Sequence, residues 1–359
     1  MANNPKTKPF DGPHGAAQLP SVVVTSYNLE ARDDEGFVGD RARRAAIFEH
    51  LEDLRAAMRE NGDDPIETPS DQLKKKDLDA LLTDGDPQEA ALVHSAVERY
   101  AESLATVVRR FCRSKAWSEV ERIVVGGGFR QSRVGELAIA RAGIILRTDG
   151  QKIELVPIRY HPDEAGLIGN AHIAPKWMFE AFDSLIAVDI GGSNIRTGIV
   201  ELRQDKAPDL SKAKVFEFEL WRHADETTDR DRAVARLGEM IMNQLKAADR
   251  GGLKVAPFIG IGCPGIIQPD GAIERGAQNL PGNWESSRFN LIESVRAAVP
   301  TIGNHETVVT MHNDAVIQGL SETPFMQDVR HWGVLTIGTG LGNASYENRK
   351  ATRCTGVKA

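Results

Sequence analysis

Two strand–turn–strand units with glycine-rich turns constrain the fold of this chain more than any other feature. The first, LIAVDIGGSNIRTGIVEL, spans residues 185–202, and the second, WGVLTIGTGLGNASYENR, spans residues 332–349. Glycine lets backbone N–H groups approach a ligand without a Cβ in the way, and such turns can cradle phosphate oxygens. One Gly-Gly turn alone is equally well explained as a plain hairpin. Two turns with hydroxyl or amide side chains between the glycines favour a pair of phosphate-binding turns. Their residues are Gly191, Gly192, Ser193 and Asn194, and Gly338, Thr339, Gly340 and Gly342.

Two aspartates stand at the ends of strands near these turns. Asp189 ends the first strand of the first unit, and beside a phosphate cradle it implies an intervening cation such as Mg²⁺ or its bound water. Asp314 lies in HNDAV, where a strand gives way to a helix. An aspartate there either stabilises the helix start through capping and the helix dipole, or acts as a general base for a hydroxyl that attacks a phosphoryl group. Between two phosphate-binding turns, the general base is the favoured interpretation.

The rest of the chain alternates strands with amphipathic helices. Apolar residues at helical spacing predict helices over 40–61, 87–112 and 231–248, and a small-residue helix over 163–174. Strands are predicted at 20–26, 121–129 and 215–222, and this alternation indicates an α/β fold with mixed sheets. The strand at 121–129 ends in Gly126, Gly127 and Gly128, which form either a simple strand-to-helix turn or a site of close approach to a nucleoside.

Composition excludes several classes of protein. The length of 359 residues, with 41% hydrophobic and 26% charged residues, is typical of a soluble globular chain with about two domains. A net charge of −7 argues against a nucleic-acid footprint. The cysteines at 112, 263 and 354 are isolated, so they support neither a disulfide framework nor a zinc cluster. No apolar run approaches the roughly 20 residues that span a bilayer. No secretory signal is recognisable in MANNPKTKPFDGPHG, so a cytoplasmic location is expected.

The motifs VDIGGSNIRTGIV, GIGCPGIIQPDGAI, NLPGNWE, HNDAVIQGLSE and LTIGTGLGNA together resemble the ROK group of sugar kinases in the actin–hexokinase superfamily. The resemblance implies a two-lobed actin/hexokinase-like (ribonuclease H-like) fold, ATP with Mg²⁺, and transfer of the γ-phosphoryl group to a sugar hydroxyl. By motif match, Asp314 is the general base, and Asn279 and Asn313 join it as sugar ligands. Asp189 and the two glycine turns face the phosphates and the metal, and residues 126–128 face the nucleoside.

The order of the motifs differs from the family's order. In the family the first phosphate turn lies near the N-terminus and the strand that ends in glycines lies near the C-terminus, whereas here the order is reversed. The resemblance therefore implies a circular permutation, with a duplicated and decayed fusion as the rival explanation. Permutation is tolerable because the termini of a domain are usually close together. The expected division begins with an N-terminal segment at 1–85, which is partly an insertion in the large lobe, and continues with a large nucleotide-binding lobe at 86–180. A small lobe with the first phosphate turn follows at 181–312. The chain then returns to the large lobe at 313–359, which carries the second phosphate turn.

Two departures from the family limit what the resemblance implies. The family's CxCGxxGC run is absent, so no structural zinc is expected. The family's ExGH sugar-binding motif does not follow the second phosphate turn, because the sequence ends at RKATRCTGVKA. Under permutation its counterpart is GPHGAAQLPSVVV at 12–24, where Gln18 and Ser21 occupy the positions of the Glu and the His. Loss of that carboxylate puts glucose itself in doubt as the substrate.

The sequence thus predicts ATP-dependent phosphorylation of a hexose or amino-sugar hydroxyl, as in a glucokinase-like enzyme. One alternative is a non-catalytic ROK-type sugar sensor that regulates transcription. It is disfavoured because residues 40–61 form one long amphipathic helix rather than a helix-turn-helix, and because the chain is acidic. The other alternative is a nucleotide hydrolase that needs no sugar. No nucleic-acid or membrane partner is expected. The sugar, the hydroxyl, the phosphoryl donor and a homodimeric state are left open.

Overall fold

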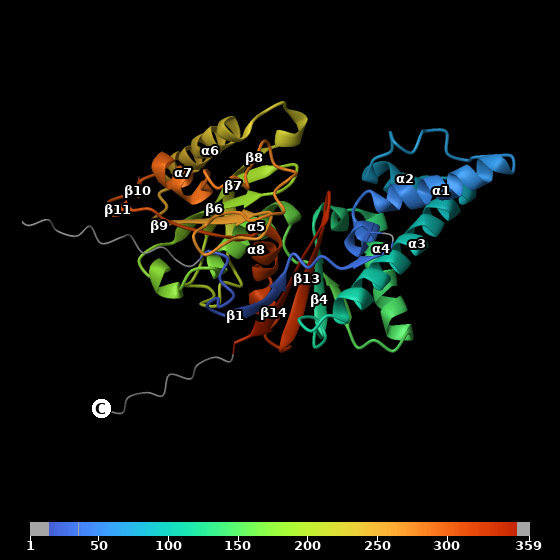
Figure 1. The fold of residues 1–359 in the computed structure, drawn as a ribbon, viewed down its shortest axis with the longest axis horizontal. Helices are drawn as coiled ribbons and strands as arrows, with labels where there is room; N and C mark the ends of the chain where they lie inside the picture. The colour runs from blue at the N-terminus through green and yellow to red at the C-terminus, as the bar shows by residue number, and fades with distance from the viewer. Residues whose placement is uncertain (1–13, 35, 350–359) are drawn as a thin grey trace, which may run out of the picture.

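Two five-stranded mixed sheets form the centres of two lobes in the computed structural model, which describes residues 14–34 and 36–349 (Figure 1). The β6 lobe is named after its central strand and contains β6 (Ser184–Ile190), β7 (Ile195–Glu201), β8 (Lys214–Trp221), β9 (Val255–Cys263) and β12 (Val308–Asn313). The β13 lobe contains β1 (Val22–Tyr27), β4 (Arg122–Gly126), β5 (Glu154–Pro157), β13 (His331–Ile337) and β14 (Leu341–Asn348). The predicted α/β class with mixed sheets is confirmed.

The two sheets share one topology. In the β6 lobe the order is β12-β9-β6-β7-β8, with β6, β7 and β8 antiparallel and β9 and β12 parallel to β6. In the β13 lobe the order is β1-β14-β13-β4-β5, with β13, β14 and β1 antiparallel and β4 and β5 parallel to β13. The chain passes through the second sheet in a different order, because β1 comes first and β13 and β14 come last. These two ends of the described chain pair with each other: Val22 lies opposite Asn348, and the Arg349 N–H donates to the Ser21 carbonyl at 3.0 Å.

Alternation along β6 divides the core of the β6 lobe between two faces. Every residue of β6 is buried, as expected of a central strand that is covered on both sides. Ile186, Val188 and Ile190 pack in one cluster with the apolar stripes of α6 (Arg230–Arg250) and α7 (Leu291–Ala298). Leu185 and Ala187 point to the other face and join a cluster that continues into the β13 lobe. A small pair of strands, β10 (Thr301–Ile302) and β11 (His305–Glu306), lies beside this sheet.

Four helices cover the outer face of the β13 sheet, on the side away from the β6 lobe (Figure 1). They are α1 (Ala46–Glu60), α2 (Lys75–Asp84), α3 (Pro87–Cys112) and α4 (Arg133–Thr148). The predicted helix at 87–112 is confirmed, because Asp86 accepts hydrogen bonds from the Gln88 and Glu89 N–H groups and Pro87 occupies the first turn. The helix predicted at 40–61 begins later, at Ala46, after a 3₁₀ turn over Val38–Ala42. A short pair of strands, β2 (Arg32–Asp33) and β3 (Gly36–Phe37), precedes that turn.

Two short helices, α5 (Pro162–Gly169) and α8 (Asp314–Leu320), pack against each other between the sheets (Figure 1). They approach so closely that a Cβ on Gly169 would lie 1.7 Å from the Ile317 carbonyl oxygen. The helix predicted over 163–174 is therefore too long, because α5 ends at Gly169 and a 3₁₀ turn over Asn170–His172 follows. The buried Asn170 amide donates to the Gly166 and Val188 carbonyls, which fixes this turn against β6.

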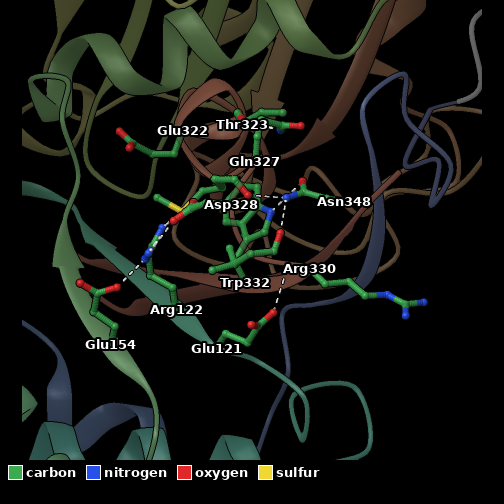
Figure 2. Close-up of polar contacts among 12 residues, drawn as sticks. Glu121, Arg122, Glu154, Glu322, Thr323, Gln327, Asp328, Arg330, Trp332 and Asn348 are labelled. Atoms are coloured by element: carbon green, nitrogen blue, oxygen red, sulfur yellow. Dashed lines mark hydrogen bonds and ion pairs between the residues drawn. The ribbon is translucent and has the colours of Figure 1, made fainter. Parts of the chain in front are cut away.

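A polar cluster fastens the connection from α8 to β13 at the end of the β13 sheet where β4 and β13 begin (Figure 2). Arg122 pairs with Glu154 on β5 and donates two hydrogen bonds to Asp328, at 2.9 and 3.0 Å. The Asn348 amide donates to the Val329 carbonyl at 2.8 Å and accepts from the Trp332 indole at 3.2 Å. Because parallel strands begin at one edge and end at the other, this cluster lies at the opposite edge from the Gly338–Gly342 turn. No helix in the described part of the chain is long and apolar enough to cross a membrane.

Candidate functional site

Both glycine turns line one cleft of about 530 Å³, whose walls come from both lobes. Each predicted strand–turn–strand unit is a β-hairpin, β6–β7 in one lobe and β13–β14 in the other. The turns meet across the cleft, where the Ser193 and Thr339 hydroxyl oxygens are 3.0 Å apart and share a hydrogen bond. The expected turn residues that line the cleft are Gly191, Gly192, Ser193, Asn194, Gly338, Thr339, Gly340 and Gly342.

The glycines in these turns serve different purposes. A Cβ on Gly340 would meet no atom within 4 Å, so this glycine leaves open space in the cleft above the backbone. A Cβ on Gly342 would lie 2.3 Å from the Thr336 hydroxyl, so this position requires glycine for packing. The first turn is closed by the Gly191 N–H, which donates to the Asn194 carbonyl at 2.8 Å, and the buried His223 side chain contacts the Gly191 carbonyl at 2.9 Å. The second turn is closed by the Gly338 N–H, which donates to the Gly340 carbonyl at 2.9 Å, so hydrogen bonds within the chain shape both turns.

Asp314 is the first residue of α8 and faces the cleft. The residue that caps this helix is Asn313, whose side-chain oxygen accepts from the Ala315 and Val316 N–H groups at 3.0 and 3.3 Å. Capping therefore explains Asn313 and leaves the Asp314 carboxyl directed to the cleft. Burial of the carboxyl, followed by the negative charge of Asp189, raises the pKa of Asp314 from 3.8 to about 7. A carboxylate with this pKa can take up and release a proton near neutral pH.

Asp189 is 4% exposed and forms an ion pair that the sequence analysis did not identify. Arg196 lies opposite Asp189 on β7, and its guanidinium donates to the Asp189 carboxylate at 3.1 Å and to Asp163 of α5 at 2.6 Å. Burial raises the pKa of Asp189, and Arg196 opposes that shift. The sequence could have predicted this pair, because a hairpin closed by the Gly191–Asn194 pair makes residues 189 and 196 cross-strand neighbours. All three charged side chains line the cleft.

The fit of Mg²⁺ to this site depends on Asp189 and Asp314. Their carboxylates are close enough for the charge of Asp189 to raise the pKa of Asp314, and a cation bound between the lobes would relieve this repulsion. Within the described residues, no group of three or more His, Cys, Asp or Glu side chains gathers as a metal site. Mg²⁺ in phosphate-binding sites usually takes only one or two carboxylates, with substrate oxygens and water as the other ligands. The residues therefore fit a magnesium ion that arrives with a phosphate chain.

The expected sugar ligands Asn279 and Asn313 both line the cleft, with different surroundings. The Asn313 amide nitrogen donates to the Gly265 carbonyl at 3.0 Å, so only one of its N–H groups is left for a ligand. Asn279 is exposed and lies beside Gly192. Gln18 lines a different cavity, of about 290 Å³, and not the cleft, so the expected match of Gln18 to the family's sugar-binding Glu stays a prediction that the cleft lining does not support. Ser21 lies at the end of the β1–β14 pair, beside Arg349.

The third glycine run reaches the cleft through Gly127 and Gly128, whereas Gly126 lies beneath the Gln318 side chain. Gly127 has a φ of +84°, and a Cβ there would lie 2.3 Å from the Ile337 carbonyl oxygen, so this backbone requires glycine. Gln318 lies one turn after Asp314 on the same face of α8. Its buried amide oxygen has no hydrogen-bond partner in the described part of the chain. The amide is therefore a candidate ligand contact that the sequence analysis missed.

A wall of the cleft comes from a part of the chain that no motif covered. Its first half runs from the end of β1 to the first residue of β2, and its second half runs from β3 to the residues before α1. The Arg44 N–H donates to the Gly338 carbonyl at 3.0 Å, which joins this wall to the second glycine turn. The lining residues of the wall are Asn28, Glu30, Arg32, Phe37, Asp40 and Arg44. No sequence signal marked these residues, because contacts with distant segments place them, such as the hydrogen bond from the Asn28 N–H to the Asn343 carbonyl of β14 at 3.0 Å.

Comparisons with known proteins add little to this geometry. No protein-family model matches the sequence, and no curated protein does. Among solved structures, the chain is similar to the Lmo2764 protein from Listeria monocytogenes, described as "a putative N-acetylmannosamine kinase", at 23% identity and a TM-score of 0.33. It is also similar to an exopolyphosphatase from Cytophaga hutchinsonii at 14% identity and a TM-score of 0.25. Each match covers 47% of this chain and about half of the other, 50% and 51% respectively.

Proposed function

We propose that the protein is a sugar kinase that transfers the terminal phosphoryl group of ATP to a sugar hydroxyl. One observation carries the proposal: two glycine turns touch across a cleft that also contains a carboxyl whose pKa is raised to about 7. Phosphoryl transfer requires little covalent chemistry from a protein, so positioning and charge neutralisation supply most of the catalysis. The cleft offers both, with fixed backbone turns for the phosphates and one carboxylate for the acceptor.

In this mechanism each group of the chain has one task. The Gly191–Asn194 and Gly338–Gly342 turns hold the phosphates through backbone N–H groups and through the hydroxyls of Ser193 and Thr339. Arg196 supplies a positive charge beside the first turn. Asp314 accepts the proton of the attacking hydroxyl, and its pKa near neutrality suits this role. Asn279 and Asn313 orient the sugar, and closure of the lobes excludes water. Mg²⁺, when bound with ATP, would be held by Asp189 and would neutralise phosphate charge.

The two alternatives predict other behaviour of the same cleft. A sugar sensor does not need a proton acceptor beside the phosphate turns, so the raised pKa of Asp314 favours an enzyme over a sensor. A nucleotide hydrolase would use the same base on water, and no contact within the described residues distinguishes it from a kinase. Turnover with and without sugar is therefore the decisive comparison.

The proposal includes a circular permutation of a ROK-type kinase. The identical strand orders of the two lobes support it, because the β13 lobe becomes a copy of the β6 lobe when β1 is read after β14. The pairing of β1 with β14 also supports it, since one short connection between residues 349 and 21 would restore the hairpin. A duplicated and decayed fusion does not require that these two strands be neighbours.

The test is a coupled assay of ADP release with ATP and Mg²⁺ over a panel of hexoses, amino sugars and N-acetyl sugars. We expect one sugar class to stimulate ADP release and to yield a phosphorylated sugar. Asp314→Asn should lower this turnover by about 10²–10⁴-fold, whereas Asp205→Asn on an exposed loop should not change it. ADP release that no sugar stimulates would refute the kinase and favour the hydrolase. Specific binding of promoter DNA without turnover would favour the sensor.

A further inference from the structure

Two cations beside the cleft have no role in the proposed mechanism: Arg44 lines the cleft, and Lys75 is bonded to its lining residue Gly128. Lys75 is the first residue of α2, is half-buried, and its ammonium donates a hydrogen bond to the Gly128 carbonyl. Arg44 lines the cleft beside the second glycine turn, to which its backbone N–H is bonded. Lys75 therefore lies at the turn that follows β4, and Arg44 lies at the turn that follows β13.

Neither cation is neutralised by a carboxylate of its own. Among the residues that the structure describes, the side chains of Arg44 and Lys75 form no ion pair. The two carboxylates near Lys75 already have partners, because Asp79 accepts from the Val134 N–H at 2.9 Å and Asp163 is paired with Arg196. Burial, followed by the positive charge of Arg44, lowers the pKa of Lys75. Two like charges held together at a cleft wall repel each other unless an anion lies between them.

We propose that Arg44 and Lys75 form an anion subsite that binds the phosphate chain of the donor at the Gly128 and Gly338 turns. The ligand chemistry is an oligophosphate, because a hexose or N-acetyl sugar is uncharged and an amino sugar is cationic, so none of these acceptors would pair with the two cations. Two sources share this chemistry, namely a nucleoside triphosphate and inorganic tripolyphosphate. The subsite rests on the proposed function for its role in phosphoryl transfer, although oligophosphate binding itself does not depend on turnover.

Calorimetric titration of the full chain with sodium tripolyphosphate, ADP and adenosine tests the subsite. We expect Lys75→Met and Arg44→Met each to weaken tripolyphosphate binding about tenfold, as loss of one charge-assisted contact predicts, with adenosine binding unchanged. Lys75→Arg should restore most of the affinity. Lys76→Met is the matched control, since Lys76 is the exposed neighbour on the same helix and should leave affinity unchanged. Identical melting temperatures would exclude a folding defect.

The outcomes separate this subsite from the proposed function. A loss for both tripolyphosphate and ADP assigns the subsite to a nucleotide's phosphate chain, and a loss for tripolyphosphate alone assigns it to an inorganic chain. Equal tripolyphosphate affinity in the wild type and both methionine variants would overturn the subsite, as would an equal loss in Lys76→Met. If no sugar is phosphorylated and binding still depends on Lys75, the subsite stands and the kinase proposal fails.

Discussion

Replacing Asp314 by asparagine separates the cost of burying this carboxyl from its proposed role as a base. The pKa of Asp314 is raised from 3.8 to about 7, first by burial and next by the charge of Asp189. Such a carboxyl keeps its proton longer in the folded than in the unfolded state. The folded state therefore loses stability as the pH rises from about 3.8 to about 7, and the loss is complete above that window.

The size of the effect follows from the two pKa values. One pKa unit corresponds to about 1.4 kcal/mol, so an ionised Asp314 costs the folded protein about 4 kcal/mol at pH 8. At pH 5 the cost is only about 2 kcal/mol, because the folded carboxyl still keeps its proton. Asparagine has a similar shape and no charge to bury. We therefore expect Asp314→Asn to raise the free energy of unfolding by up to about 4 kcal/mol at pH 8 and by much less at pH 5.

Urea denaturation of wild type and variant at pH 5, 6, 7 and 8 measures this difference. Asp205→Asn is the control, because Asp205 is exposed and its substitution should change stability little at any pH. A variant that is no more stable than the wild type at pH 8 would refute the reasoning, and so would a gain that does not grow with pH. The same variant should lose kcat by about 10²–10⁴-fold with nearly unchanged nucleotide affinity. The wild-type kcat/KM should rise with pH through about 7.

Four further perturbations test other parts of the structure. Arg196→Met leaves Asp189 buried without its partner, so it should cost about 3 kcal/mol of unfolding free energy at pH 8. Because burial raises the pKa of Asp189, this cost should become smaller as the pH is lowered, and urea denaturation over a series of pH values measures the change. In Gly166→Ala the new Cβ would lie 2.5 Å from the Asp189 carboxyl carbon. The free energy of unfolding should therefore fall by about 1–3 kcal/mol in urea denaturation, and nucleotide binding should weaken. The control Gly143→Ala, at another buried helical glycine, should leave the free energy of unfolding unchanged or raise it. Arg122→Met removes the ion pairs drawn in Figure 2 and should cost about 1–2 kcal/mol with unchanged kcat, since the cluster lies at the far edge of the sheet. A chain with its termini joined by a Gly-Ser linker and opened between Gly62 and Asp63 should keep its circular dichroism spectrum and its nucleotide binding; a chain that does not fold would contradict the permutation.

Sequence patterns predicted those parts of the fold that depend on local chemistry. The helix at 87–112 has both its start signal and its apolar stripe within its own residues, so its bounds could be predicted without a structure. The two hairpins and the placement of Asp314 at a helix start likewise follow from neighbouring residues. The end of α5 at Gly169 could not be predicted, because it depends on contact with Ile317 of another helix.

The cleft was predictable only in part for the same reason. The glycine turns carry their own signal, and a correct hairpin register would have identified Arg196 opposite Asp189. Gln318 follows Asp314 by four residues at a predicted helix start, so helical spacing could have identified it. Arg44 and Lys75 carry no such signal. They lie beside the cleft because α1 and α2 pack on α3, and this packing is not visible in a local pattern.

The geometry of the cleft is compatible with the proposed permutation of the chain. The expected turn and base residues stand where a strand ends or a helix begins: the first turn after β6, the second after β13, Gly127 after β4 and Asp314 after β12. Their relative positions are therefore set by the pairing and packing of the two sheets and not by which segment the ribosome makes first. In an unpermuted chain a short link would join β14 to β1. Cutting that link removes no strand pairing and changes only the entropy of closing a loop, which varies slowly with loop length. A new link elsewhere costs a similar amount, so one site can be assembled from the segments in either order.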